Sequence, residues 1–254
     1  MIFQAESYQG SLRGNTESLH LLRNGKVDLD PKKLFFDGRL KGVCIYCGAM
    51  ADTRDHVPSR ILLDHPYPSN MNIVPACNLC NNRFSRDEAY LACIIDCAQS
   101  GGLVEVKRKK VRDLLDSNVS LASKIHNQTV ISLEGQRLLP EMNRVSNVIV
   151  KIARGHLYYE CSEIFLHEPS YLMIKPFHSM SEIEIKEYGK CHRVRIFPEI
   201  GSRAFVKHFA SQKLGISHDW EVVQVGRYRF MVDYSNITIK FVLSEYLACE
   251  VGWI

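Results

Sequence analysis

Two Cys-x-x-Cys pairs constrain this chain more than any other feature of the sequence. Cys44 and Cys47 form the first pair, and Cys77 and Cys80 form the second. A structural zinc ion takes four tetrahedral thiolate or imidazole ligands and keeps no open position. Two pairs of this spacing rarely arise by chance, so they predict one closed zinc site that staples the enclosed segment. The alternatives are two unrelated surface turns, or a redox pair, which neither position favours because neither opens a βαβ unit.

The whole chain is a 254-residue sequence with 46% apolar residues, nine cysteines and a net charge of +4. No run of about 18 apolar residues is present, and the N-terminus lacks the pattern of a signal peptide, so we expect no membrane span and a cytoplasmic location. In such a chain, the cysteines indicate metal binding plus free thiols and not a disulfide framework. The mild positive charge is compatible with nucleic acid but does not establish it.

The segment between and beside the cysteine pairs carries polar residues suited to phosphodiester hydrolysis. That reaction needs a base that deprotonates water and a cation that neutralises the developing charge. His56 is a suitable base, and Asp55 is a hard oxygen ligand for a divalent ion. The amide oxygen of Asn72 can accept a hydrogen bond from an imidazole N–H and fix its orientation. The side-chain oxygen of Asn81, at the start of the helix expected after Cys80, can be the second ligand of the divalent ion beside Asp55.

Local patterns place these residues on a hairpin and a helix. Thr53–Val57 and Asn72–Val74 are the expected strands, and a helix is expected from Asn78 onward. Adjacent strand residues point to opposite sides, so Asp55 and His56 need a bend to reach one phosphate. Pro58, two residues on, is consistent with such a bend.

The combined pattern resembles the HNH endonuclease motif in its four-cysteine form. The residues that carry the resemblance are Cys44-x-x-Cys47, Asp55-His56-x-Pro58 and Asn72-x-x-Pro75-x-Cys77-x-x-Cys80-Asn81. The resemblance covers only this part of the chain and implies a ββα-metal finger. It implies that His56 is the general base, that Asn72 orients it, and that Asp55 and Asn81 hold a catalytic Mg²⁺ or Mn²⁺ ion. It also implies that the four cysteines hold a structural Zn²⁺ ion.

One position departs from the family pattern. Many members carry a basic residue four places after the last cysteine, where this chain has Phe84. We expect Phe84 to pack under the finger. The candidates for phosphate contact are therefore four other basic side chains, each of which could equally be a solvated surface residue: Arg54, Arg60, Arg83 and Arg86.

We expect three regions: an N-terminal arm over 1–43, the HNH domain over 44–100 and a C-terminal region over 101–254. In the arm, Asp30-Pro31 has the pattern of a helix start. Ser85-x-x-Glu88 is a capping-box signature that leads into a helix ending at Gly101, in which Cys93 and Cys97 are expected core thiols.

The C-terminal region predicts helices followed by an antiparallel sheet. Lys107–Arg112 is a basic run, interpreted as a solvated face or a phosphate contact. Residues 140–160 have the apolar spacing of a long helix, with a structural or capping role expected for His156. Alternation then predicts strands, the last three of which form a meander; the predicted strands are Thr129–Leu133, Tyr171–Ile174, Trp220–Val225, Tyr228–Tyr234 and Ile237–Leu243.

These observations predict an α+β protein, a zinc-stapled ββα finger followed by helices and an antiparallel sheet. The expected function is metal-dependent DNA cleavage by in-line attack of water, with phage defence or restriction as a hypothetical role. A cut across both strands of a duplex would suggest a homodimer, because one finger cuts one strand at a time. The alternative is a non-catalytic zinc module or a subunit of a larger complex, docked to a protein partner through residues 101–254.

Overall fold

The computed structural model describes residues 40, 42–69, 71–103, 105–132, 135–190, 199–207, 220–234 and 236–253. The described part combines helices with antiparallel sheets, which agrees with the predicted α+β class. The N-terminal arm, with its expected helix start at Asp30-Pro31, lies almost entirely outside the described residues. Among the described residues, no helix is both long and apolar enough to cross a membrane.

The finger consists of a hairpin followed by a long helix, in the predicted order. Strands β1 (Thr53–Val57) and β2 (Asn72–Ala76) pair antiparallel, with the short 3₁₀ helix η1 (Arg60–Leu62) in the loop between them. Helix α2 (Asn78–Ser100) follows, and its first turn is stabilised by Asp52, whose Oδ1 accepts from the Asn78 N–H at 2.6 Å. Gly101 ends α2 in the left-handed region, at φ 77°.

The expected helix start at Asn78 is confirmed, whereas the capping box at Ser85 is wrong, because α2 runs through this position without interruption. The Ser85 hydroxyl bonds back to the carbonyl oxygen of Asn82, and Glu88 is buried. The N-cap of the helix is instead Cys77, whose sulfur accepts from the Cys80 N–H. The structure confirms the expected core thiols, since Cys93 and Cys97 are both buried.

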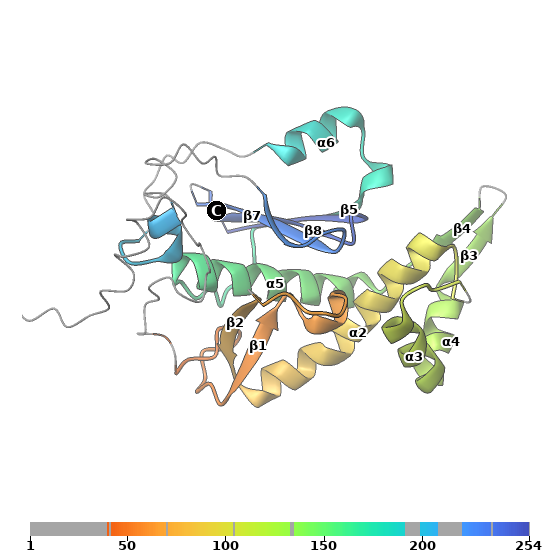
Figure 1. The fold of residues 1–254 in the computed structure, drawn as a ribbon, viewed down its shortest axis with the longest axis horizontal. Helices are drawn as coiled ribbons and strands as arrows, with labels where there is room; N and C mark the ends of the chain where they lie inside the picture. Colours follow the sequence, from red (N-terminus) through yellow and green to blue (C-terminus); the bar gives the residue numbers. More distant parts are fainter. Residues whose placement is uncertain are drawn as a thin grey trace, which may run out of the picture.

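Helix α5 (Met142–Cys161) lies between the finger and the C-terminal sheet (Figure 1). Its predicted apolar stripe is confirmed, since Val145, Val148, Ile149 and Ile152 are all buried. Gly155 allows α5 to approach the hairpin closely, because a Cβ at this position would lie 2.4 Å from Cγ2 of Val57. One continuous core therefore joins the finger to α5 and to the C-terminal sheet.

A smaller group of elements lies at one end of α2 (Figure 1). It contains helices α3 (Lys109–Ser117) and α4 (Val119–Asn127) and the hairpin of β3 (Thr129–Ser132) and β4 (Gly135–Leu138). The expected strand at Thr129–Leu133 is thus confirmed over Thr129–Ser132, and Leu133 lies outside the described residues. The Tyr90 hydroxyl ties this group to α2, because it donates to Gln128 Oε1 at 2.7 Å.

The C-terminal sheet has the strand order β5-β9-β8-β7-β6, with every neighbouring pair antiparallel. Its strands are β5 (Tyr171–Pro176), β6 (Glu221–Gln224), β7 (Tyr228–Asp233), β8 (Thr238–Leu243) and β9 (Leu247–Gly252). The predicted meander is confirmed, and β9 is an additional strand that pairs with both β8 and β5. Helix η2 (Phe177–Ser179) and helix α6 (Glu182–Gly189) follow β5, and α6 covers the face of the sheet opposite α5 (Figure 1).

Candidate functional site

The four predicted zinc ligands converge at one end of the finger. The sulfur atoms of Cys44, Cys47, Cys77 and Cys80 all lie within 4.8 Å of one another, and those of Cys47 and Cys77 are 3.7 Å apart. A tetrahedron with Zn–S bonds of about 2.3 Å has S···S edges of about 3.8 Å. The donor set and its spacing therefore fit a metal ion such as zinc.

Thiol chemistry within this cluster also suits a metal. The Cys80 N–H donates to the Cys77 sulfur at 3.4 Å and lowers the pKa of the Cys77 thiol to about 7. Burial raises the pKa of Cys44 and of Cys80. Thiolates are the metal-binding form, so a bound cation would favour deprotonation of all four groups and release their protons.

Asp55 and His56 lie on opposite faces of the hairpin. Strand β1 pairs with β2 in regular register through Val57, so the predicted bend is absent from the strand itself. Asp55 is buried on the inner face, whereas His56 is half-buried on the outer face, beside the exposed Arg54. Asn81, in the first turn of α2, reaches this strand: its Nδ2 lies 3.4 Å from the carbonyl oxygen of Arg54, the residue before Asp55.

A buried cation holds the carboxylate of Asp55. The Lys151 ammonium, on α5, lies 2.7 Å from Asp55 Oδ2 and also forms an ion pair with Glu88 on α2. The Tyr46 hydroxyl donates to the same Oδ2 at 2.8 Å. Burial first, and then the Asp55 charge, raise the pKa of Tyr46 well above 10, so Tyr46 remains a neutral donor. Both contacts of Asp55 use Oδ2, and Oδ1 accepts no hydrogen bond from the described residues.

Asn72 contacts a different histidine from the one predicted. It lies on the inner face of the hairpin, 3.4 Å from Nδ1 of His156, so it does not orient His56 in this structure. His156 is fully buried, bonds to the Tyr228 hydroxyl at 2.6 Å and stacks on Phe230. Burial lowers the pKa of His156 to about 3, so this histidine is neutral and structural, as expected.

The four candidate phosphate-binding arginines are all exposed, and they are spread around the finger. Arg54 lies on the outer face of the hairpin, and Arg60 lies over the ring of Tyr67 at 5.5 Å. Arg83 and Arg86 lie three positions apart near the start of α2. The expected position of Phe84 is confirmed, because its ring is buried edge-on against Tyr46 at 5.1 Å.

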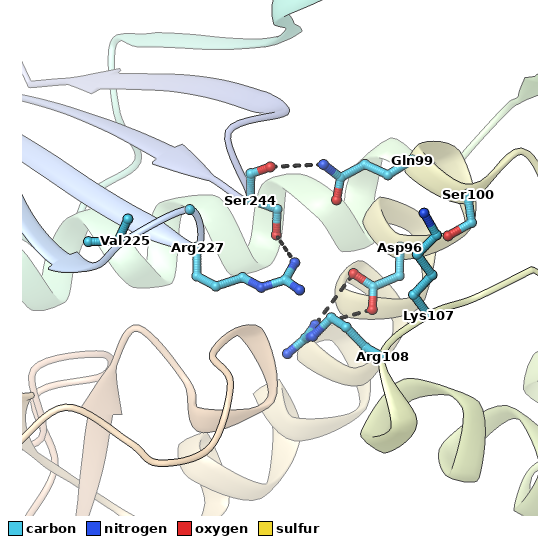
Figure 2. A pocket seen from close by; sticks show the side chains of 9 residues that line it. Asp96, Gln99, Ser100, Lys107, Arg108, Val225, Arg227 and Ser244 are labelled. Carbon is cyan, nitrogen blue, oxygen red and sulfur yellow. Dashed lines mark hydrogen bonds and ion pairs between the residues drawn. The ribbon is translucent and has the colours of Figure 1, made fainter.

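One residue of the basic run Lys107–Arg112 forms ion pairs inside the fold. Arg108 is 8% exposed; it pairs with Asp64 at 2.7 Å and with Asp96 at 3.3 Å. Arg227, from the turn before β7, also pairs with Asp64. Its Nη1 donates to the Ser244 hydroxyl (Figure 2). This network joins the finger, α3 and the C-terminal sheet, so Arg108 is a structural residue. Lys107, by contrast, lines the pocket in Figure 2.

Sequence reasoning missed Lys151 and Glu88, although both carry a usable signal. Each is a charged residue placed on the apolar stripe of its helix: Lys151 follows Val148 by three positions, and Glu88 follows Phe84 by four. A charge at such a position is rarely buried without a partner. The identity of the partner was not visible, because Lys151 is far from both carboxylates in the sequence.

The chain matches no protein-family model, no curated protein and no solved structure in the comparisons made. The structure itself brings the four cysteines together beside the hairpin and the start of α2. This cluster can hold a metal such as zinc.

Proposed function

We propose that this chain is a metal-dependent endonuclease whose catalytic unit is the zinc-stapled finger. The observation that supports it best is the contact of Asn81 with the backbone of Arg54. It brings the first turn of α2 beside β1, the strand that carries Asp55 on its inner face and His56 on its outer face. The proposal assigns His56 as the base and Asp55 and Asn81 as two oxygen ligands of a metal ion. The four cysteines would hold a structural zinc ion that fixes the start of α2 relative to the hairpin.

In this proposal, His56 removes the proton from a water molecule that attacks phosphorus in line with the leaving 3′ oxygen. The P–O3′ bond breaks, the 3′ oxygen takes a proton, and the products carry a 5′-phosphate and a 3′-hydroxyl. Asp55, through its Oδ1, and Asn81, through its amide oxygen, would hold a Mg²⁺ or Mn²⁺ ion. Such an ion, when bound, neutralises charge on the phosphorane and the leaving group.

A second candidate function has its own structural support. The Lys151 ammonium already neutralises Asp55, and Asn72 is held by His156. Both contacts bury residues that a nuclease of this type would use. They favour a non-catalytic zinc module that binds nucleic acid, or a subunit that becomes active only when a partner rearranges α5.

Cleavage of end-labelled DNA oligonucleotides, single-stranded and duplex, separates the two functions. The nuclease predicts products with 5′-phosphate and 3′-hydroxyl ends, lost in Asp55→Asn and Asn81→Ala but retained in the control Lys186→Ala, an exposed residue of α6. Retarded but intact DNA would support the binding module instead. Cleavage that persists in both Asp55→Asn and Asn81→Ala would contradict the proposed metal ligands.

A further inference from the structure

A second cavity of about 500 Å³ lies beside the cysteine cluster, between α2, α5 and the segment 166–172. This volume falls within the ~300–1,000 Å³ of typical small-molecule sites. One wall is polar and comes from α5: Asn143, Ser146 and Asn147. The lining also has an apolar part, made of Val150 on the same helix and of Phe84, Leu166, Pro169 and Leu172.

Arg154 lines this cavity with unused hydrogen-bond donors. Its side chain is only 10% exposed, and its Nη2 donates to the carbonyl oxygens of Leu166 and His167 and to Glu168 Oε1. Its Nε is buried and has no partner among the described residues, and no contact there uses Nη1. A buried donor without a partner costs about 1–3 kcal/mol, and more when it is charged. An anionic acceptor in the cavity would remove this cost.

The charges around the cavity favour an acceptor at Arg154. Arg83, which is exposed, and Arg154 supply two positive charges. The carboxylate of Glu168 contacts Arg154 at 3.2 Å but is 82% exposed, so this pair is weak and readily replaced. Cys47 and Cys80 also line the cavity, and four thiolates around zinc would carry a net negative charge. An anion is therefore favoured at Arg154, the buried guanidinium.

We propose that this cavity binds a phosphate-bearing nucleotide unit. The phosphate lies on Arg154 and Arg83, because the planar guanidinium donates to two phosphate oxygens at once. The base lies along the apolar lining residues, and the side-chain amide of Asn143 meets its polar edge. The neighbouring Asn147 is held by Asp87, to which its Nδ2 donates at 3.0 Å. This inference rests on the proposed nucleic-acid function. The unit can come from a free mononucleotide or from a single strand.

Binding is measured on full-length His56→Ala protein without added divalent ions, so that no strand is cut. The probes are thymidine 5′-monophosphate, inorganic phosphate and a fluorescent oligothymidine. Arg83→Ala and Asn143→Asp should weaken binding by about 10- to 100-fold, because each removes or repels a charged contact. Arg154→Lys keeps the charge but loses the planar donor pair, so it should weaken binding as well. Lys186→Ala is the matched control and should bind normally.

Each outcome is decisive. Binding of the mononucleotide that weakens in these variants supports a site for free nucleotides. Binding of the oligonucleotide alone supports a site for a single strand. Absence of binding by every probe overturns the proposal. It is also overturned if Arg83→Ala and Asn143→Asp bind as tightly as the parent protein. This second test does not depend on whether Arg154→Lys folds. Sensitive binding in a protein that fails to cleave DNA would refute only the nuclease.

Discussion

Replacing Lys151 with methionine should destabilise the fold strongly, because it leaves two buried carboxylates without a cation. Asp55 and Glu88 are each only 6% exposed, and Lys151 is 1% exposed. Removal of one partner from a buried ion pair costs about 3–5 kcal/mol. For a chain of this size, that corresponds to a fall of roughly 6–20 °C in the midpoint of thermal unfolding.

The assay is urea unfolding followed by circular dichroism at neutral pH. Lys186→Met removes an exposed lysine from α6 and should change the free energy of unfolding by less than about 0.5 kcal/mol. Lys151→Met combined with Glu88→Gln should recover part of the loss, because only one buried charge then lacks a partner. If Mn²⁺ can replace the ammonium at Asp55, it should stabilise Lys151→Met more than wild type. A loss below about 1 kcal/mol in Lys151→Met would refute the buried-triad account.

Three further predictions concern the metal, a buried histidine and a close helix contact. Cys77→Ser should abolish stoichiometric zinc binding, as measured by elemental analysis, and zinc uptake by wild type should weaken as pH falls because the thiols must lose protons. Burial lowers the pKa of His156 to about 3, whereas a histidine in the unfolded chain titrates near 6.5. Below about pH 6 the unfolded state therefore binds more protons, and the free energy of unfolding should fall by up to about 1.4 kcal/mol per pH unit. His156→Gln should flatten this pH dependence in urea titrations, and an unchanged slope would contradict the prediction. Gly155→Ala should cost about 1–3 kcal/mol because its Cβ meets Val57, and Val57→Ala in the same chain should recover part of that loss; additive losses would argue against the contact.

Local sequence signals predicted the elements of the finger well. Alternation and the cysteine spacing located β1, β2 and the convergence of the four thiols, because both depend on residues close in sequence. The Ser85 capping signature failed for a physical reason: the Cys77 sulfur and the Asp52 carboxylate already satisfy the helix start seven or eight positions earlier. Once α2 has begun there, the Ser85 hydroxyl bonds within the helix.

Contacts between distant segments decided what the sequence left open. The opposite placement of Asp55 and His56 follows from simple strand alternation, and the hairpin register maintains it. The partners of the inner face could not be predicted, because Lys151 and His156 reach Asp55 and Asn72 only after α5 packs on the hairpin. Strand β9 was missed because its interrupted apolar pattern, LACEVG, gives no clean alternation, although pairing on both sides buries most of it.

The most direct test of the proposed nuclease is nicking of supercoiled plasmid by the purified chain in Mg²⁺, Mn²⁺ or EDTA, beside His56→Ala. The proposal predicts nicking that requires the divalent ion and disappears in His56→Ala, while that variant retains its fold and its zinc. Undiminished nicking by His56→Ala would contradict the assigned base. No nicking by wild type with zinc bound would contradict an autonomous nuclease and favour the non-catalytic or partner-activated role.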